Sequence, residues 1–495
     1  RVGGGLRGTS LLPTAQVTYV DPGSELTADA IAQGNGGNII IWSDRATHFH
    51  GRLSAQGGLL SGDGGLADIS GKLNLAYNGD VSLAAPNGDI GTLLFDPREI
   101  IIKNGNGKNV PLLPSLPDIF DSKTNSSIPF TIYEETLENL ASGTNINLEA
   151  TIDITIEDLA DNELTLTPNT NITFYADVNG NGTGSFSMDP SDTIRAPGGD
   201  VTILGGDQST HINVAAIDTT AAPGESSSGN IYLSNSGEIN IEKTLNAGNG
   251  NITISSDTID FSENSDTVVA NQLNIQPAAV ETDIYIGEPG IGEAGADALN
   301  LSLRDIRSIG INVGQINIGH TSALGQPDGT GSIQLSSSAA DATGNGVTSP
   351  VVLLGNLLNP ENITLVGPEL ETTWTLSDRN IGTLSGYSNL QFQNIANLEL
   401  GDNLDTIIFD NSRSQISQSI DGGSGDLVFV GNDIQMPTST SGLGNFSIRP
   451  HTGNQTVAIE LGGTDQGQPN VLKLVDTALQ GIQNSFSSLT IGDSE

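Results

Sequence analysis

The residues with the clearest chemical potential are oxygen ligands in one short segment. Asp177, Asn179 and Asn181 alternate along the sequence DVNGNG, with glycine at the sixth position, as in the opening of a calcium-binding loop. The twelfth position is Met188 instead of the glutamate that would bind calcium with both oxygens, and the adjacent Asp189 fits only a shifted loop. Two interpretations stay open: a Gly/Asn corner, and a site that binds Ca²⁺ weakly.

Histidines provide a second, weaker candidate. His48 and His50 would share one face of an extended strand, but there is no cysteine and no third histidine nearby, and Arg45 disfavours a cation. We therefore predict an exposed strand end here. The other histidines are isolated in the sequence: His211, His320 and His451.

Two acidic glycine-rich segments, Gly401–Asp405 and Asp421–Asp426, resemble the nonapeptide calcium repeat. Neither keeps the full spacing or occurs in tandem, so both are predicted to be turns. No phosphate-binding loop, dinucleotide fingerprint or Gly-x-Ser-x-Gly elbow is present. We therefore predict no catalytic residues and no cofactor beyond loosely held calcium.

The elements that must position these groups are short β-strands. Four to six residues alternate apolar with polar side chains, and Gly, Asn or Asp turns bound them. Helical periodicity is limited to three short windows, at Glu134–Leu140, Leu303–Ile309 and Leu474–Ile482. The strongest strand segments are at residues 38–42, 73–77, 145–148, 152–156, 171–174, 201–204, 230–233, 238–241 and 251–254.

Two all-β architectures fit this pattern: a string of sandwiches and a parallel β-solenoid. The solenoid is favoured because Gly-Asn or Gly-Asp turns recur just before a strand, as at residues 34–38, 198–200 and 248–251. Glycine and asparagine adopt the backbone conformations of such corners at low cost, and stacked asparagines can pair between coils.

An internal repeat supports stacking. Without gaps, residues 298–319 align with residues 471–492, and every match is apolar or glycine. The upstream strand Ile284–Ile286 falls on Val457–Ile459 at the same offset, so the repeat covers 284–319 and 457–492. We divide the chain into a β-helix segment (1–105), a Pro-rich loop or insert (106–130), solenoid coils (131–280) and solenoid modules with the repeat (281–495).

The charge excludes some partners. The chain of 495 residues has 17 Lys and Arg against 58 Asp and Glu, a formal charge of −41. So few cations cannot form the basic face that nucleic acids or anionic membranes require. No apolar run is long enough to span a membrane as a helix, and the absence of cysteine excludes disulfides. The sequence starts at Arg1 and not with the charged and then apolar segments of a leader peptide, so we expect an interior piece of a longer protein.

The first hundred residues carry a series of motifs in a specific order. They read VGGGLRG, LPTAQVTYVD, LTADAIAQGNGGNIIIWSDRATHFHGRLSAQGG, GGLADISGK and LAAPNGDIGTLLFDP. This order resembles the repeat region of large exoproteins of the filamentous haemagglutinin family, which use two-partner secretion, and cyanobacterial versions in particular. Residues 284–335, 457–492 and 373–402 also resemble modules of such proteins.

The resemblance implies a right-handed parallel β-helix, with inserted hairpins or short helices, that is secreted or displayed at the outer membrane. It implies a stalk that supports adhesion to glycans or proteins of host or neighbouring cells, or to an abiotic surface. Export would use an outer-membrane transporter acting through a domain outside this chain. A toxin-delivery stalk would have the same architecture.

A β-helix polysaccharide lyase or hydrolase is the enzymatic alternative. Such an enzyme needs carboxylates that converge with a cation in one groove. Asp96, Arg98 and Glu99 form the closest local group, for which a structural turn is predicted.

Overall fold

The computed structural model describes residues 1–8, 13–106, 128–140, 143–261, 268–279, 282–287, 298–309, 311–319, 330–336, 349–355, 363–387, 389–451, 458–462 and 471–492. The chain divides into two compact units. Unit 1 is residues 1–254 with 260–262 and 267–271, and unit 2 is residues 255–259 and 263–266 with 272–495. The fold is all-β with long parallel sheets.

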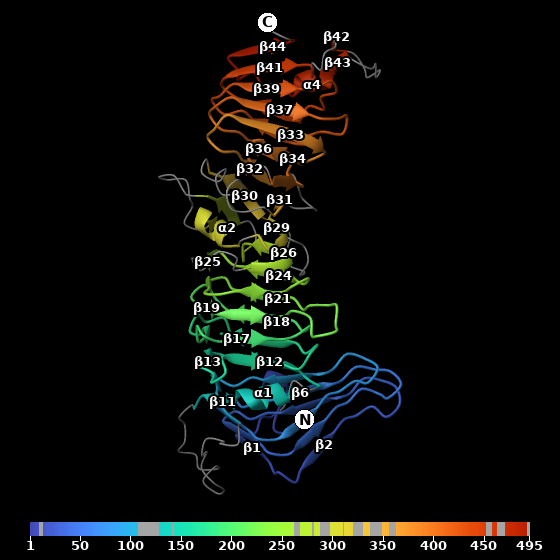
Figure 1. Ribbon diagram of the computed structural model, residues 1–495, viewed down its shortest axis with the longest axis vertical. Helices are drawn as coiled ribbons and strands as arrows, with labels where there is room; N and C mark the ends of the chain where they lie inside the picture. Colours follow the sequence, from blue (N-terminus) through green and yellow to red (C-terminus); the bar gives the residue numbers. More distant parts are fainter. Residues whose placement is uncertain are drawn as a thin grey trace. The chain divides into compact units, whose positions relative to one another are not determined.

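Unit 1 is built from parallel strands that visit three positions in turn, and one such circuit is called a coil here. Equivalent strands of successive coils pair side by side, as the layers β12, β18, β21 and β24 show in Figure 1. The first position contains β1 (Val17–Val20), β4 (Ala46–Phe49), β7 (Asn74–Tyr77), β10 (Ile100–Lys103), β11 (Phe130–Tyr133), β13 (Ile154–Ile156), β16 (Phe186–Met188), β19 (His211–Val214), β22 (Glu238–Ile241) and β25 (Thr258–Phe261).

The other two positions complete each coil. The second contains β2 (Glu25–Thr27), β5 (Arg52–Ser54), β8 (Asp80–Ser82), β14 (Glu163–Thr165), β17 (Thr193–Arg195), β20 (Ala216–Asp218), β23 (Leu245–Asn246) and the start of β26 (Val268–Gln276). The third contains β3 (Asn38–Ile41), β6 (Leu66–Ile69), β9 (Thr92–Phe95), β12 (Asn145–Glu149), β15 (Ile172–Ala176), β18 (Val201–Gly205), β21 (Ile231–Ser234) and β24 (Asn251–Ser255).

Alternation along each strand forms the core. In β15, Ile172 and Phe174 are buried while Thr173 and Tyr175 are partly exposed, and β18 repeats this pattern in register. Buried aliphatic residues therefore stack into columns between coils, and burying apolar area is the main driving force of folding. A single coil could not bury its own apolar side chains, so the coils depend on one another.

One corner of unit 1 is a column of Asn and Asp side chains. The side-chain oxygens of Asn145, Asn171, Asp200 and Asn230 each accept the backbone N–H of the equivalent residue one coil further, at 2.7–3.0 Å, and the last donor is Asn251. The pairing that was expected between side-chain amides is thus made mainly from side chain to backbone. It satisfies donors that the tight corner leaves unpaired.

Glycine is required beside this column. A Cβ on Gly199 would lie 1.9 Å from the Thr170 carbonyl oxygen, and one on Gly229 would lie 1.9 Å from that of Gly199. The corners therefore stack backbone against backbone, closer than any side chain permits.

Unit 2 continues the parallel pattern within its own boundaries. Its strands are β27 (Thr282–Ile286), β28 (Leu299–Leu301), β29 (Val313–Gly319), β30 (Thr330–Leu335), β31 (Val351–Leu354), β32 (Thr364–Val366), β33 (Thr372–Asp378), β34 (Ile381–Leu384), β35 (Leu390–Gln393), β36 (Asn397–Glu399), β37 (Asp405–Phe409), β38 (Ser419–Asp421), β39 (Leu427–Val430), β40 (Ser439–Ser441), β41 (Asn445–Arg449), β42 (Ala458–Leu461), β43 (Val471–Leu474) and β44 (Ser488–Ile491). The antiparallel β34 lies between β33 and β35, which makes an inserted hairpin.

Three short α-helices occur among the described residues: α1 (Glu134–Leu140), α2 (Leu303–Ile309) and α4 (Asp476–Gln480); a 3₁₀ turn, η1, spans Leu6–Gly8. They confirm the three predicted helical windows. Each follows a strand that pairs in parallel with the strand before it: β10 with β11, β27 with β28, and β42 with β43. This arrangement of doubled strand and helix is called the strand–helix module.

The strand–helix module corrects the sequence repeat in two ways. First, it has a third copy, at β10–β11–α1–β12, that the sequence comparison missed. Second, the register pairs Ile284 with Leu299 but Ile459 with Leu472. By register, Ile284 is therefore equivalent to Ile459, two residues beyond the position that the ungapped alignment gives it. The shift arises because the connections between the two paired strands differ in length.

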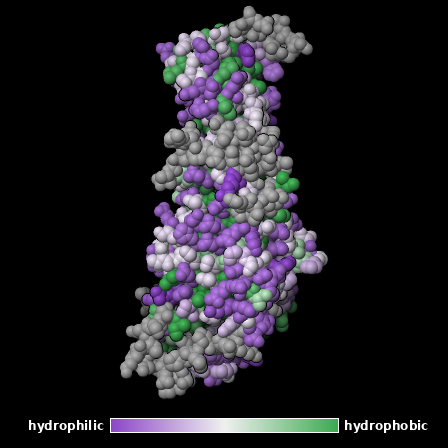
Figure 2. Space-filling model, turned by 60° about the vertical axis from the view of Figure 1, so that its left-hand side comes forward, coloured by the Kyte–Doolittle hydropathy of each residue, from purple (hydrophilic) through white to green (hydrophobic). Residues whose placement is uncertain are grey.

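The described helices are all too short to cross a membrane. Among the residues coloured in Figure 2, most are hydrophilic and the hydrophobic ones form small groups. This surface agrees with strands that alternate buried apolar side chains with partly exposed polar ones.

Candidate functional site

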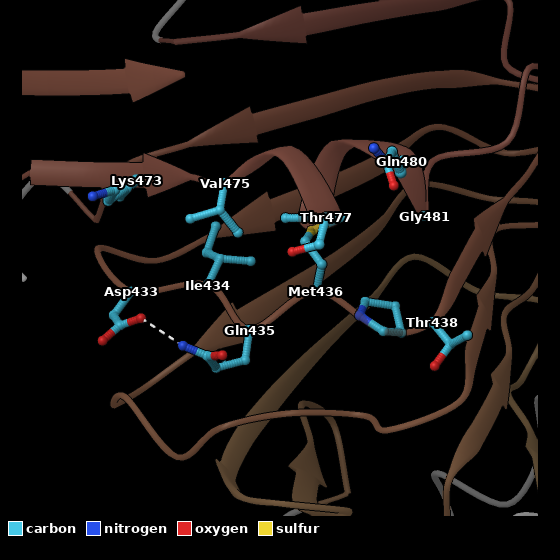
Figure 3. A pocket seen from close by; sticks show the side chains of 12 residues that line it. Asp433, Ile434, Gln435, Met436, Thr438, Lys473, Val475, Thr477, Gln480 and Gly481 are labelled. Carbon is cyan, nitrogen blue, oxygen red and sulfur yellow. Dashed lines mark hydrogen bonds between the residues drawn. The ribbon is translucent and has the colours of Figure 1, made fainter. Parts of the chain in front are cut away.

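A cleft of about 670 Å³ lies in unit 2 beside helix α4. One wall is the turn at residues 433–438, which leads into β40, and the other is the end of β43 with α4. We call it the α4 cleft, and Figure 3 shows its lining. Hydrogen bonds from Thr440 N–H to the Gly481 carbonyl (2.9 Å) and from Gln483 N–H to the Thr440 carbonyl (2.8 Å) fix the end of α4 against β40.

The lining of the α4 cleft combines apolar and polar side chains. Ile434 is buried and lies with Val475 at one part of the cleft, whereas Gln480 and Thr438 lie at the other (Figure 3). Gln435 Nε2 donates to Asp433 Oδ1 at 2.9 Å, which orients both side chains. Such a volume falls within the roughly 300–1,000 Å³ of small-molecule pockets.

A second cleft, of about 480 Å³, lies in unit 1 beside helix α1. One wall is the turn before β8, with Asn78, and the first residue of β8, Asp80; the other is the face of α1 that carries Glu135 and Asn139. The helix is held from both sides: Gly105 N–H donates to Glu134 Oε1 (3.2 Å), and Thr165 N–H donates to Glu138 Oε1 (2.8 Å). We call it the α1 cleft.

The calcium candidates belong to a loop that closes on itself. Asp177 is fully buried at a φ of +52°, and its carboxylate accepts the N–H groups of Asn181 (3.1 Å) and Gly182 (2.8 Å) and the hydroxyl of Thr210 (3.1 Å). Asn179 Oδ1 accepts the N–H of Asn181 (3.2 Å), and Asn181 Oδ1 accepts that of Thr183 (3.0 Å). The three oxygens that were candidate ligands therefore have partners within the fold, as a Gly/Asn corner requires.

The histidine pair is less exposed than predicted. His48 lies on β4 and is only 3% exposed, so the expected exposed strand end is wrong for this residue. Tyr19 of the preceding coil lies opposite, with ring centroids 6.2 Å from His48 and 5.6 Å from His50. Burial lowers the pKa of His48 to about 4, which keeps the ring neutral at pH 7. Exposed His211 pairs with Glu238 (3.2 Å), exposed His451 donates its backbone N–H to Asn432, and His320 lies outside the described residues.

Carboxylates do converge on a cation in unit 1, and they are buried although the side chain of Arg7 is 47% exposed. Arg7 donates to Glu149 through Nε (2.7 Å) and Nη2, and its backbone N–H donates to Asp68 (3.2 Å). Asp96 is a neighbour whose N–H donates to Ser70 Oγ (3.1 Å). Asp68 is 0% exposed, Asp96 is 8% exposed and Glu149 is 4% exposed. Burial raises the pKa of Asp68 to about 6 and that of Asp96 to about 7.

One acidic group was not predicted from the sequence. Asp158, Asp189 and Asp192 each place a carboxylate oxygen within 4.8 Å of the others, an arrangement that could share a cation. Ser191 donates to Asp189, and Leu159 N–H makes long contacts with buried Asp192 at 3.3–3.4 Å. Burial raises the pKa of Asp192 to about 6.

The two glycine-rich acidic segments form turns. Asp402 Oδ1 accepts the N–H of Ser424 (2.9 Å), and Asp426 Oδ1 accepts that of Asn445 (2.8 Å), so each turn supports the next coil. Asp405 differs because it is 1% exposed and faces Trp374, whose Nε1 donates to Oδ1 at 3.3 Å.

Neither cleft could be found from sequence motifs. Their walls come from a turn and a helix of different coils, and no spacing of residue types connects them. A scan against protein-family models matches none, and no curated protein matches the chain.

Proposed function

We propose that this chain is part of the stalk of a large secreted or surface-displayed adhesin-like exoprotein, folded as a right-handed parallel β-helix. The observation that carries the proposal is the repetition of one coil, with its buried columns and its Asn/Asp corner, through successive layers of a unit. Such an arrangement extends by adding coils, because each coil contacts only its neighbours. The motifs of the first hundred residues, which resemble the filamentous haemagglutinin family, support the same assignment.

The acidic surface fits a role outside the cell. A net charge of −41 keeps neighbouring copies apart and gathers divalent cations loosely. We infer an outer-membrane-associated or extracellular location and partners on cell or abiotic surfaces. Neither nucleic acid nor membrane insertion is part of the proposal.

The enzymatic alternative receives less support from the geometry. The group of Arg7 with Asp68, Asp96 and Glu149 has the composition of a glycan-cleaving site, but its carboxylates are almost fully buried. A polysaccharide needs an open groove with an acid and a base on either side of the scissile bond. We therefore interpret the group as an anchor for the first residues of unit 1.

The test is adherence of the bacterium that produces the full-length protein, with and without its gene, to host cells, to sibling cells and to glass. The proposal expects loss of adherence to at least one surface and release of this region by external protease. Unchanged adherence to all surfaces, with no protein accessible to protease, would overturn it.

A further inference from the structure

The two clefts occupy equivalent positions in two copies of the strand–helix module. When Phe130 of β11 is aligned with Leu472 of β43, both helices begin at the same position, Glu134 and Asp476. Two consecutive helix residues then line both clefts: Glu135 and Thr136 in one, Thr477 and Ala478 in the other.

The opposite walls also correspond. In each case the wall is a turn of the preceding coil that leads into a strand, β8 in the α1 cleft and β40 in the α4 cleft. In these two copies the short helix stands where a strand would otherwise pack against that turn, and the cleft lies between them.

From these positions we propose that the α1 and α4 clefts are two binding sites for the same class of ligand, an uncharged oligosaccharide. Asp433 and Lys473 of the α4 cleft carry opposite charges, and Lys473 is also paired with Glu460 at 3.9 Å, whereas the α1 cleft carries Asp80 and Glu135. An anionic ligand would be repelled by the acidic α1 cleft, and Lys473, which is already paired, offers it no free cation in the α4 cleft. A neutral ligand suits both.

The polar groups of the rims define the ligand further. Amide side chains, which donate and accept, line both clefts: Asn78, Asn106 and Asn139 in one, Gln435 and Gln480 in the other. Sugar hydroxyls also donate and accept, so each can pair with an amide or with a carboxylate such as Asp433 or Asp80. Val81 and Leu140 in one cleft, and Ile434 and Val475 in the other, provide apolar contacts for the C–H faces of a sugar ring.

Gln435 shows how such a site is preorganised. Its bond to Asp433 uses one N–H and one carboxylate oxygen, so the amide oxygen, the second N–H and Asp433 Oδ2 can still pair with a ligand. Among the described residues no hydrogen bond is recorded for the side chains of Gln480 and Thr477. Binding therefore needs no internal bond to break.

The first experiment is affinity electrophoresis of the whole chain in native gels containing one polysaccharide each. Neutral probes are dextran, β-glucan, α-mannan and galactomannan, and anionic probes are alginate and heparin. We expect retardation by at least one neutral probe and by neither anionic probe. Retardation by no neutral probe, or by an anionic probe as strongly, overturns the proposal.

Calorimetry with an oligosaccharide of the retarding polymer then counts the sites. We expect two per chain, one after Q435A/Q480A, one after N78A/N139A, and none when all four substitutions are combined. Q391A and Q208A, which replace exposed glutamines outside the clefts, keep both sites. Binding that survives the combined substitutions, in a chain with an unchanged circular dichroism spectrum, refutes the assignment. The proposed stalk function does not depend on this result, because adherence is measured on cells.

Discussion

The buried carboxylate of Asp405 predicts a pH dependence whose size can be worked out. This residue on β37 is 1% exposed, and its Oδ2 has no hydrogen-bond partner among the described residues. Burial, reinforced by Glu369, raises the pKa of Asp405 from 3.8 to about 7, although the bond from Trp374 favours the charged form. The folded protein therefore takes up a proton that the unfolded chain does not hold between about pH 4 and 7.

The sign follows from linkage between proton binding and folding. Because the folded pKa is raised, stability rises as the pH falls from 8 through 7 and continues to rise until about pH 4. Between pH 8 and pH 5, most of the change occurs over the two pH units below the folded pKa of about 7. Each unit is worth about 1.4 kcal/mol, so the free energy of unfolding rises by about 3 kcal/mol in all. Asp405→Asn removes this dependence, since an amide does not titrate.

The assay is hydrogen exchange of peptides that cover β33 and β37, corrected for the intrinsic effect of pH. Local exchange is used because a chain with two compact units is not expected to unfold as a single two-state system. For the unsubstituted protein we expect protection about 100-fold greater at pH 5 than at pH 8, and for Asp405→Asn nearly equal protection.

The comparison of the two pH values is independent of how well asparagine packs, because any packing cost is the same at both. Asp410→Asn is the matched control, since Asp410 is exposed just after the same strand. If Asp405→Asn retains the whole pH dependence, the carboxylate is not the titrating group and the reasoning fails.

Three further predictions concern unit 1. The lowered pKa of His48 means that, between pH 6.5 and 4, this residue is protonated only in the unfolded chain, so the folded protein loses about 3 kcal/mol of stability over that range. His48→Gln should abolish this loss, and undiminished acid sensitivity of β4 in hydrogen exchange would contradict the prediction. Asp177→Ala should lower the unfolding temperature equally in Ca²⁺ and in EGTA, because the carboxylate pairs with Asn181, Gly182 and Thr210; a decrease confined to the Ca²⁺ sample would instead indicate a calcium site. Asn171→Ala should lower the local stability at β18 by about 1 kcal/mol in hydrogen exchange, since Asp200 N–H loses its acceptor, whereas Gln208→Ala should leave it unchanged; equal exchange in the two variants would contradict this.

The class of fold was predictable because its determinants are local. Alternation identified strands such as β15 and β18, and the three helical windows became α1, α2 and α4. The stacking of corners was also predictable, because glycine and asparagine recur just before the strands and adopt corner conformations at low cost. What the pattern could not specify was which atoms pair, and the side-chain oxygens proved to accept backbone N–H groups.

The first copy of the strand–helix module was missed for a physical reason. Its core positions need only be apolar, and Phe130 stands where the other two copies have Leu299 and Leu472, so a comparison of letters gives this position little weight although all three residues are buried. The pairing of strands, by contrast, shows which residues of the three copies are equivalent, because the register gives each strand residue a partner. The Arg7–Glu149 pair spans 142 residues and lies beyond any local pattern.

The position of the clefts follows from how a stacked fold can accommodate variation. Core columns and corners are constrained on both sides by neighbouring coils, so a substitution at Gly199 or Asn171 affects two layers. A helix that replaces a strand position breaks this constraint locally, because α1 forms no strand pairing with β8 and a cleft lies between them. Residues on that helix face and turn can then change without disturbing the stack. A coil fold with repeated strand–helix modules should therefore gain or lose ligand sites more readily than it changes its core. The linings of the two clefts differ in this way, since both are rich in amide side chains but they carry different charges.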